Sequence, residues 1–106
     1  MACCDPNHQS NQPAGEAGGG GVTAAERKFQ EFLQAAGAAG ALDAKTKQAI
    51  AIALSVLARC EPCVINHVKK ARASGFSQEE IDEAAWMGIA FGGSPTMVFY
   101  NRLRKS

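Results

Sequence analysis

Apolar side chains recur at helical spacing along most of this chain, and no stretch shows a convincing strand-like alternation of apolar and polar positions. The first such spacing includes Phe29 and Phe32. It follows Thr23 and Glu26, which stand in the pattern of a capping box, where two side chains pair with free backbone N–H groups at a helix start. These residues predict a helix that begins at Thr23 and ends near Gly37, because glycine commonly ends a helix.

A second helix is predicted over residues 44–59, with Asp43 as its N-cap. This segment is apolar on nearly every side. One face carries Ile50, Leu54, Leu57 and Ala58, whereas Ile52 and Val56 lie elsewhere on the helix. A helix that is apolar all round is usually buried among others, so we expect this one to be central in the fold.

A third helix should follow a break near residues 59–61. Pro62 fits the first turn of a helix and resists its interior, so the apolar helix before it cannot simply continue. We expect the new helix to extend from about Glu61 to Ser74. Gly75 is its natural C-terminal stop.

The fourth predicted helix begins with a second capping box, formed by Ser77 and Glu80, and extends to about Gly92. One face is lined by Ile81, Ala84, Ala85, Gly88 and Ile89. Trp86, Met87 and Phe91 lie largely on other faces, and a domain this small can hardly cover them all. We therefore expect identical subunits to bury this surface in a homo-oligomer.

A last helix is predicted from Ser94-Pro95 to the C-terminus, where several cations suit the negative end of the helix dipole. The expected fold is all-α, a bundle of about five helices formed by residues 22–106. Residues 1–21 are rich in glycine and polar residues and have almost nothing to bury, so they are expected to be a disordered tail.

The composition narrows the function classes. A formal net charge of +1 and 20% charged residues fit a globular protein and leave no basic footprint for nucleic acid. No secretory signal pattern is visible, and the apolar runs of about ten residues are too short to span a bilayer. We therefore expect a cytoplasmic protein without nucleic-acid or membrane partners. There, four cysteines favour catalytic or metal chemistry over a disulfide framework.

The candidate chemistry lies in Cys60, Cys63 and His67. Spaced three and four residues apart, their side chains form one stripe on a helix, and Val64 and Ala71 continue its apolar side. The stripe therefore lies where buried surface meets solvent. The thiols stand at a helix N-terminus, whose free N–H groups and dipole favour a thiolate. His67, one turn after Cys63, can take the proton of Cys63 or stabilise its thiolate as an imidazolium.

Other interpretations stay open beside redox chemistry. Free cysteines are often small buried hydrophobes. Cys60, Cys63 and His67 are also three zinc ligands, and structural zinc wants a fourth, which Cys3, Cys4, His8 or another subunit would have to supply. A non-catalytic oligomeric scaffold or thiol sensor is a further alternative. Redox chemistry ranks first because two thiols and a histidine seldom share one stripe by chance.

From Leu42 onward the chain resembles the alkylhydroperoxidase D-like (AhpD-like) branch of the carboxymuconolactone decarboxylase superfamily. The resemblance rests on Leu42-Asp43, the apolar helix before Cys60, Cys60-Glu-Pro-Cys63 with His67, and Gly92-Gly93-Ser94-Pro95. It implies an all-helical subunit that assembles into trimers or hexamers. It also implies a cofactor-free thiol peroxidase or disulfide reductase, in which Cys63 attacks a hydroperoxide and Cys60 resolves the product as a disulfide. A dithiol protein would then be the reductant.

One position departs from the resembled family. Its motif has a glutamate twelve residues before the first cysteine, where it takes part in a proton relay, and this chain has Gln48 there. An amide donates and accepts hydrogen bonds, but it cannot accept and return a proton at neutral pH. The substitution predicts slow peroxide turnover or a different redox role. The resemblance also implies that the side chain of Gln48 points at the thiol pair. Glu61 and Asp43 are possible substitutes for the missing acid.

Overall fold

The computed structural model describes residues 20–105, and within them the chain forms five α-helices and no strand. The predicted all-α fold is therefore confirmed. The helices are α1 (Gly20–Gly37), α2 (Ala44–Leu57), α3 (Glu61–Ala73), α4 (Gln78–Gly92) and α5 (Ser94–Lys105). The chain divides between Ala36 and Gly37 into two compact units, the first of which contains nearly all of α1. None of the helices described is long and apolar enough to cross a membrane.

Helix α1 ends at Gly37, as predicted, but it does not begin at Thr23. Its first turn is already formed at Gly20, so Thr23 lies inside the helix and the predicted capping box is wrong. The reason is that the two glycines assigned to the tail keep helical backbone, which leaves no helix end for Thr23 to cap. The aromatic rings of Phe29 and Phe32 stack with centroids 6.2 Å apart, and both side chains are exposed.

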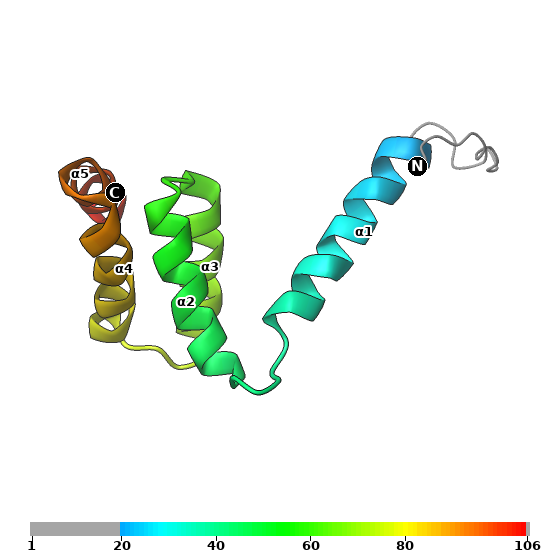
Figure 1. Ribbon diagram of the computed structural model, residues 1–106, viewed down its shortest axis with the longest axis horizontal. Coiled ribbons are helices and arrows are strands. Elements are labelled where there is room, and N and C mark those ends of the chain that lie inside the picture. The colour runs from blue at the N-terminus through cyan, green and yellow to red at the C-terminus, as the bar shows by residue number, and fades with distance from the viewer. Residues whose placement is uncertain (1–19, 106) are drawn as a thin grey trace. The chain divides into compact units, whose positions relative to one another are not determined.

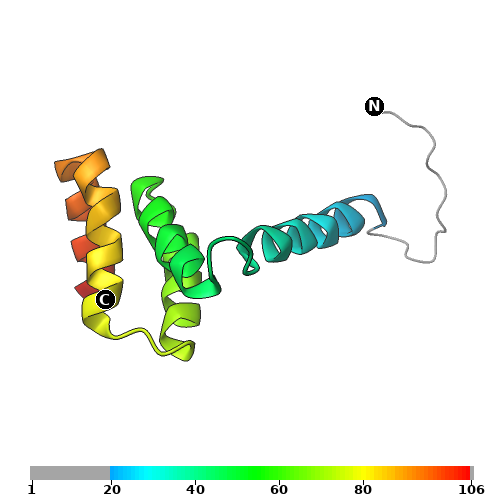
Figure 2. The same ribbon diagram turned by 60° about the horizontal axis from the view of Figure 1, so that its bottom comes forward.

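The second unit is built around α2, which packs against α3, α4 and α5, so its predicted central position is confirmed. Helices α2, α3 and α4 alternate in direction, and α5 returns along α4 (Figures 1 and 2). The side chains in its core are Ile52, Val56, Val64, Ala71, Phe76, Ile81, Ala84, Ala85, Ile89, Phe99 and Tyr100. Short connections between antiparallel helices explain this arrangement.

The buried side of α2 differs from the apolar face that the sequence emphasises. Ile52 and Val56 are fully buried, whereas Ile50, Leu54 and Leu57 are exposed to 42%, 58% and 38%. Helix α4 approaches α2 closely, since Gly88 lies so near the carbonyl oxygen of Ala53 that a Cβ atom at position 88 would collide with it. The side of α2 that carries Ile52, Ser55 and Val56 faces the core, and the side that carries Ile50, Leu54 and Leu57 does not.

The two faces predicted for α4 are found as expected. All five residues of its predicted inner face are buried, and Trp86, Met87 and Phe91 are exposed to 47%, 59% and 80%. The predicted capping box at the start of α4 is present. The side chain of Ser77 accepts from the backbone N–H of Glu80, and the carboxylate of Glu80 accepts from the backbone N–H of Ser77. Asp43 likewise caps α2, accepting from the backbone N–H of Thr46 at 2.7 Å.

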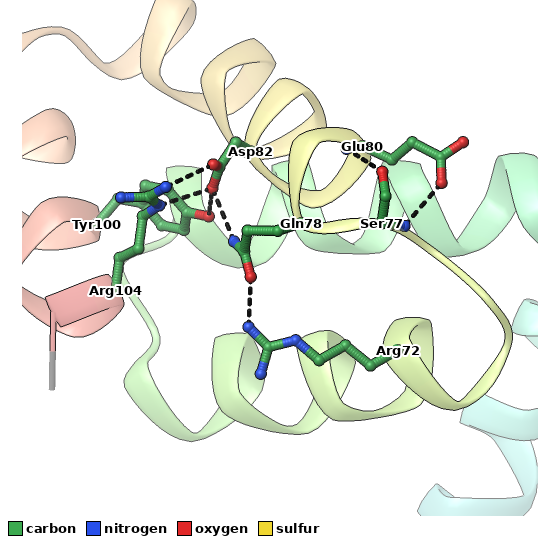
Figure 3. A network of polar contacts seen from close by, with 7 residues as sticks. All are labelled: Arg72, Ser77, Gln78, Glu80, Asp82, Tyr100 and Arg104. Carbon is green, nitrogen blue, oxygen red and sulfur yellow. Dashed lines mark hydrogen bonds and ion pairs between the residues drawn. The ribbon is translucent and has the colours of Figure 1, made fainter.

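A charged network joins α3, α4 and α5 (Figure 3). Its centre is Asp82 on α4, which accepts both guanidinium hydrogen bonds of Arg104 at 2.9 Å and the hydroxyl of Tyr100 at 2.7 Å. Gln78 also donates to Asp82, and Arg72 on α3 donates to Gln78 at 2.6 Å. Burial raises the pKa of Asp82, but these hydrogen bonds outweigh it and hold the pKa below its ordinary value.

Candidate functional site

The turn between α2 and α3 sets where the thiols stand. Arg59 follows the C-cap of α2 with φ 54°, in the left-handed region, and its N–H donates to the carbonyl oxygen of Val56. The N–H of Cys60 then donates to the carbonyl oxygen of Ser55. This bond completes a Schellman motif at the end of α2. Cys60 is at the same time the N-cap of α3, and Pro62 occupies its first turn. The break predicted near residues 59–61 is therefore confirmed.

Cys60 and Cys63 are joined by a disulfide across the first turn of α3, with their Cα atoms 5.2 Å apart. This spacing lies within the range that unstrained backbones use for disulfides. Cys60 is half-buried and Cys63 is exposed, so one of the two cysteines can be reached from solvent. Because both stand at a helix N-terminus, reduction of the bond would leave thiols where the helix dipole favours an anion.

The predicted stripe on α3 lies at the boundary between core and solvent. Val64 and Ala71 are buried, His67 is half-buried, and Asn66 and Lys70 are exposed. His67 follows Cys63 by one helical turn on the same side of α3, and residues four apart are neighbours on a helix surface. The imidazole ring therefore belongs to the same part of the surface as the thiol pair.

Gln48, on α2, contacts this ring directly. Its side-chain nitrogen Nε2 lies 3.2 Å from Nδ1 of His67 and donates to the backbone carbonyl oxygen of His67 at 3.1 Å. Position 48 thus faces the motif helix, but its side chain contacts the histidine and not the thiol pair at which it was predicted to point, and the structure assigns Gln48 no hydrogen bond to either sulfur. Its side chain is half-buried between the two helices.

The surroundings of His67 favour its neutral form. Burial lowers the pKa of His67 below its ordinary value, and the positive charge of Lys70, one turn further along α3, lowers it further. At neutral pH the ring is therefore uncharged. The disulfide-bonded form thus disfavours an imidazolium at His67, which is the charged form that could stabilise a thiolate.

The two acids weighed as substitutes for the missing glutamate are placed differently. The carboxylate of Asp43 is engaged in capping α2, which lowers its pKa. Glu61 lies exposed in the first turn of α3, next to Cys60 in the chain. Among residues 20–105, no three His, Cys, Asp or Glu side chains gather so that they could hold a metal ion. Cys3, Cys4 and His8, the extra zinc ligands weighed from the sequence, lie outside the described residues.

A groove of about 630 Å³ lies elsewhere on the second unit, along α3, α4 and α5. It is lined by Val64, Ile65, Val68, Lys69, Arg72, Gln78, Ile81, Tyr100, Leu103 and Arg104. None of Cys60, Cys63, His67 or Gln48 lines it. The chemistry therefore points to the thiol stripe as the candidate site, and the groove is the surface beside the charged network.

Fold and site together define a class of small all-helical proteins with a C-x-x-C disulfide at the start of a helix and a histidine one turn later. The family comparison agrees with this class. Residues 23–102 match the carboxymuconolactone decarboxylase family, and the chain belongs to it, within the AhpD-like superfamily. The resemblance drawn from the motif is therefore confirmed at the level of the family.

Solved structures of the family share the fold. A carboxymuconolactone decarboxylase family protein of Thermotoga maritima, suggested to take part in an antioxidative response, is 29% identical with a TM-score of 0.70, over 77% of this chain and 84% of that protein. The apo form of a family member from Legionella pneumophila is 30% identical with a TM-score of 0.71, over 80% of this chain and 76% of that one.

Curated relatives match parts of this chain. A protein of the cox locus of Paracoccus denitrificans is 48% identical over 48 residues, which are 45% of this chain and 43% of the relative. An uncharacterised protein of Cupriavidus necator is 33% identical over 79 residues, 74% of this chain and 70% of the relative. The match thus spans less than half the length of the Paracoccus protein and about two thirds of the Cupriavidus protein.

Proposed function

We propose that this protein is a thiol-based peroxidase or disulfide reductase that uses Cys60, Cys63 and His67 and needs no cofactor. The observation that carries the proposal is the Cys60–Cys63 disulfide at the start of α3, with Cys63 exposed. A disulfide in the first turn of a helix, with one cysteine reachable from solvent, can cycle between dithiol and disulfide. The suggested antioxidative role of the Thermotoga relative supports the same class of chemistry.

The proposed cycle balances as follows. The thiolate of Cys63 attacks the terminal oxygen of a hydroperoxide; an S–O bond forms, the O–O bond breaks, and the alcohol leaves after taking up one proton. The sulfur of Cys60 then attacks that of Cys63, forming the disulfide and releasing water. A dithiol protein reduces the disulfide by exchange and becomes oxidised itself. Two electrons pass from the reductant to the hydroperoxide, and His67 is the group that the helix places beside Cys63.

The assignment of roles to the two cysteines can be tested by single substitutions. Peroxide consumption with a dithiol reductant should be lost in Cys63→Ser, whereas Cys60→Ser, assayed without reductant, should consume one hydroperoxide per molecule and leave Cys63 as a sulfenic acid. A Cys3→Ser, Cys4→Ser double variant is the matched control and should turn over normally. If Cys63→Ser retained turnover and Cys60→Ser did not, the roles of the two cysteines would be reversed.

A thiol sensor is the second candidate function, favoured by one observation. The residue that contacts His67 from α2 is an amide rather than an acid, so no carboxylate relay reaches the ring from there. A sensor would form the Cys60–Cys63 disulfide reversibly in stoichiometric peroxide but show no sustained consumption. Mass mapping of the oxidised protein, combined with the turnover assay, separates the two functions.

The proposal includes self-assembly. Trp86, Met87 and Phe91 expose a large apolar area on one helix, and such areas usually mark interfaces. Burial between identical subunits would give closed symmetry, and the resemblance to AhpD-like proteins implies a homo-trimer or homo-hexamer. Light scattering at micromolar concentration should report a trimer or hexamer, and Met87→Lys should shift the population toward monomer. A stable wild-type monomer would contradict the assembly.

A further inference from the structure

The contact between Gln48 and His67 determines which ring nitrogen carries the proton. The carbonyl oxygen of His67 is only an acceptor, so the group of Gln48 that faces it at 3.1 Å must be the NH₂ group. If the amide were flipped, two oxygens would face each other at this distance. The backbone therefore fixes the orientation of the amide without reference to the ring.

The same NH₂ group lies 3.2 Å from Nδ1 of His67. Its second hydrogen is available for this contact, because only one is used by the carbonyl oxygen. Nitrogen Nδ1 must then be the acceptor, and an accepting nitrogen carries no proton. In the neutral ring the proton consequently resides on Nε2.

We propose that Gln48 is a positioning residue that holds His67 as the Nε2–H tautomer, so that His67 serves the thiol pair as a hydrogen-bond donor and not as a base. This inference rests on the function proposed above for Cys60 and Cys63. Nδ1 is occupied by the amide, and Nε2 already carries its proton, so neither nitrogen accepts the proton of a thiol. Solvent takes that proton, and Nε2–H is the group of the ring left to donate to a thiolate at Cys63, the residue one turn earlier on α3.

A carboxylate at position 48 would reverse this arrangement. It has no hydrogen to give Nδ1, and it would accept from Nδ1–H instead, leaving Nε2 free to act as a base. Gln48 thus distinguishes a ring that stabilises an anion from one that moves protons. The exchange of a single side-chain nitrogen for oxygen is sufficient.

The tautomer can be measured directly by nitrogen-15 NMR of the imidazole ring, because protonated and unprotonated ring nitrogens have well-separated chemical shifts. The chain has two histidines, so a His8→Gln background leaves the signals of His67 alone. The oxidised protein is used at about pH 8, above the ordinary histidine pKa of about 6.5 and with no thiol of the pair titrating. We expect an unprotonated Nδ1 and a protonated Nε2. A protonated Nδ1 would overturn the proposal.

Substitutions sharpen the test. Gln48→Glu should move the proton to Nδ1 and raise the pKa of His67, whereas Gln34→Glu, the same charge change at an exposed position of α1, should alter neither. Gln48→Met, of similar length without a donor, should give a mixture of tautomers. Retention of the pure Nε2–H form in either position-48 variant would show that Gln48 does not set the tautomer. The wild-type measurement decides the matter even if neither variant folds.

Kinetics supply a separate readout. With Nε2 free as a base, Gln48→Glu should raise peroxide turnover at least tenfold, since general acid–base catalysis typically contributes about 10²–10⁴-fold. Its midpoint for pH-dependent alkylation of Cys63 should move to higher pH, because the donor to the thiolate is lost and a negative charge is added. If turnover is absent from every variant, the peroxidase proposal fails while the NMR result still decides the tautomer. A Gln48→Glu variant with unchanged turnover and unchanged alkylation would contradict the donor role.

Discussion

The two ends of α3 use the same backbone scheme with different residues. At its start Arg59 takes the left-handed position of a Schellman motif with φ 54°, and at its end Gly75 takes the corresponding position with φ 98°. After Gly75, the N–H of Phe76 donates to the carbonyl oxygen of Ala71. In the same way, the N–H of Cys60, after Arg59, donates to the carbonyl oxygen of Ser55. The residue that follows the turn is a buried core side chain in one case and a cysteine of the disulfide in the other.

The side-chain contacts at the two ends of α3 also differ. The C-terminal end is tied to α4 and α5 by the charged network around Asp82, in which the carboxylate has several partners (Figure 3). The N-terminal half is tied to α2 by one neutral amide at His67. One end thus has the contacts expected of structural support, and the other keeps groups available for chemistry. Arg59 adds to this contrast, because non-glycine residues in left-handed conformations cluster at functional sites.

Breaking the charged network should have the largest effect on stability. Asp82→Ala removes the acceptor of two Arg104 hydrogen bonds and leaves the buried hydroxyl of Tyr100 without it, so we expect a loss of about 2 kcal/mol. Urea unfolding at fixed protein concentration measures this loss. Glu83→Ala, the adjacent exposed acid, should change stability by less than about 0.5 kcal/mol. Equal losses in the two variants would mean that the network does not hold the far end of α3.

The contribution of Asp82 should also depend on pH. Because its pKa is lowered in the folded protein, its stabilisation is fully present above the unfolded carboxyl pKa of about 3.9 and is lost as the pH falls through the folded value. The difference in stability between wild type and Asp82→Asn should therefore be constant near neutral pH and shrink below about pH 4. A difference that grew on acidification would contradict this assignment.

Gly75→Ala tests the second half of the comparison. A side chain at φ 98° is strained, and no neighbouring atom obstructs the new Cβ, so the effect isolates the backbone term. We expect a loss of about 1–2 kcal/mol, the usual cost of left-handed backbone for a residue with a Cβ atom. Gly37→Ala, at the end of α1, is the control, because its Cβ likewise meets open space and its backbone is not left-handed. If Gly37→Ala lost as much stability as Gly75→Ala, the left-handed backbone at Gly75 would not be the cause of the loss.

Arg59→Gly should stabilise the protein, by less than Gly75→Ala destabilises it. Glycine relieves the left-handed strain but adds conformational entropy to the unfolded chain, so the net gain is expected to be about 0.5–1 kcal/mol. The matched control is Arg102→Gly, an exposed arginine inside α5, where the same substitution should destabilise. If Arg59→Gly also destabilised the protein, the arginine side chain would be making contacts that outweigh the strain.

Local sequence rules explain what was predictable. Asp43, Ser77 with Glu80, Pro62 and Gly75 each act within a few residues of the chain, and each has the predicted role in the structure. The position of the thiols at the start of α3 followed from the same rules. The placement of Cys60, Cys63 and His67 on one helix could therefore be predicted from their spacing.

Other features depend on contacts between distant segments and were not predictable. The burial of Ile52 and Val56, and the exposure of Ile50 and Leu54, depends on which side of α2 the other helices cover. The hydrogen bonds of Gln48 depend on the register of α2 against α3, which no local pattern fixes. The left-handed Arg59 had no signal, since glycine is the usual residue there. At Thr23 a local rule failed, because the same residue pattern also occurs within a continuous helix.

The smallest expected effect concerns the charge next to His67. Lys70 follows His67 by three residues, about one helical turn, and its positive charge opposes protonation of the ring, which burial already disfavours. Lys70→Gln should therefore raise the pKa of His67 slightly, and the shift should shrink as salt screens the charge. An NMR titration of His67 in the His8→Gln background measures it.

Stability should follow this titration with a defined sign. Because the folded pKa of His67 lies below its unfolded value of about 6.5, the neutral ring stabilises the fold above that pH, and the benefit is lost as the pH falls through the folded value. Lys70→Gln should reduce the stability that the protein loses as the pH falls through this range. Lys69→Gln is the matched control, since it removes the same charge from the neighbouring residue, which lines the groove. A shift of equal size in both variants would show that net charge, and not the position of Lys70 beside the ring, sets the pKa of His67.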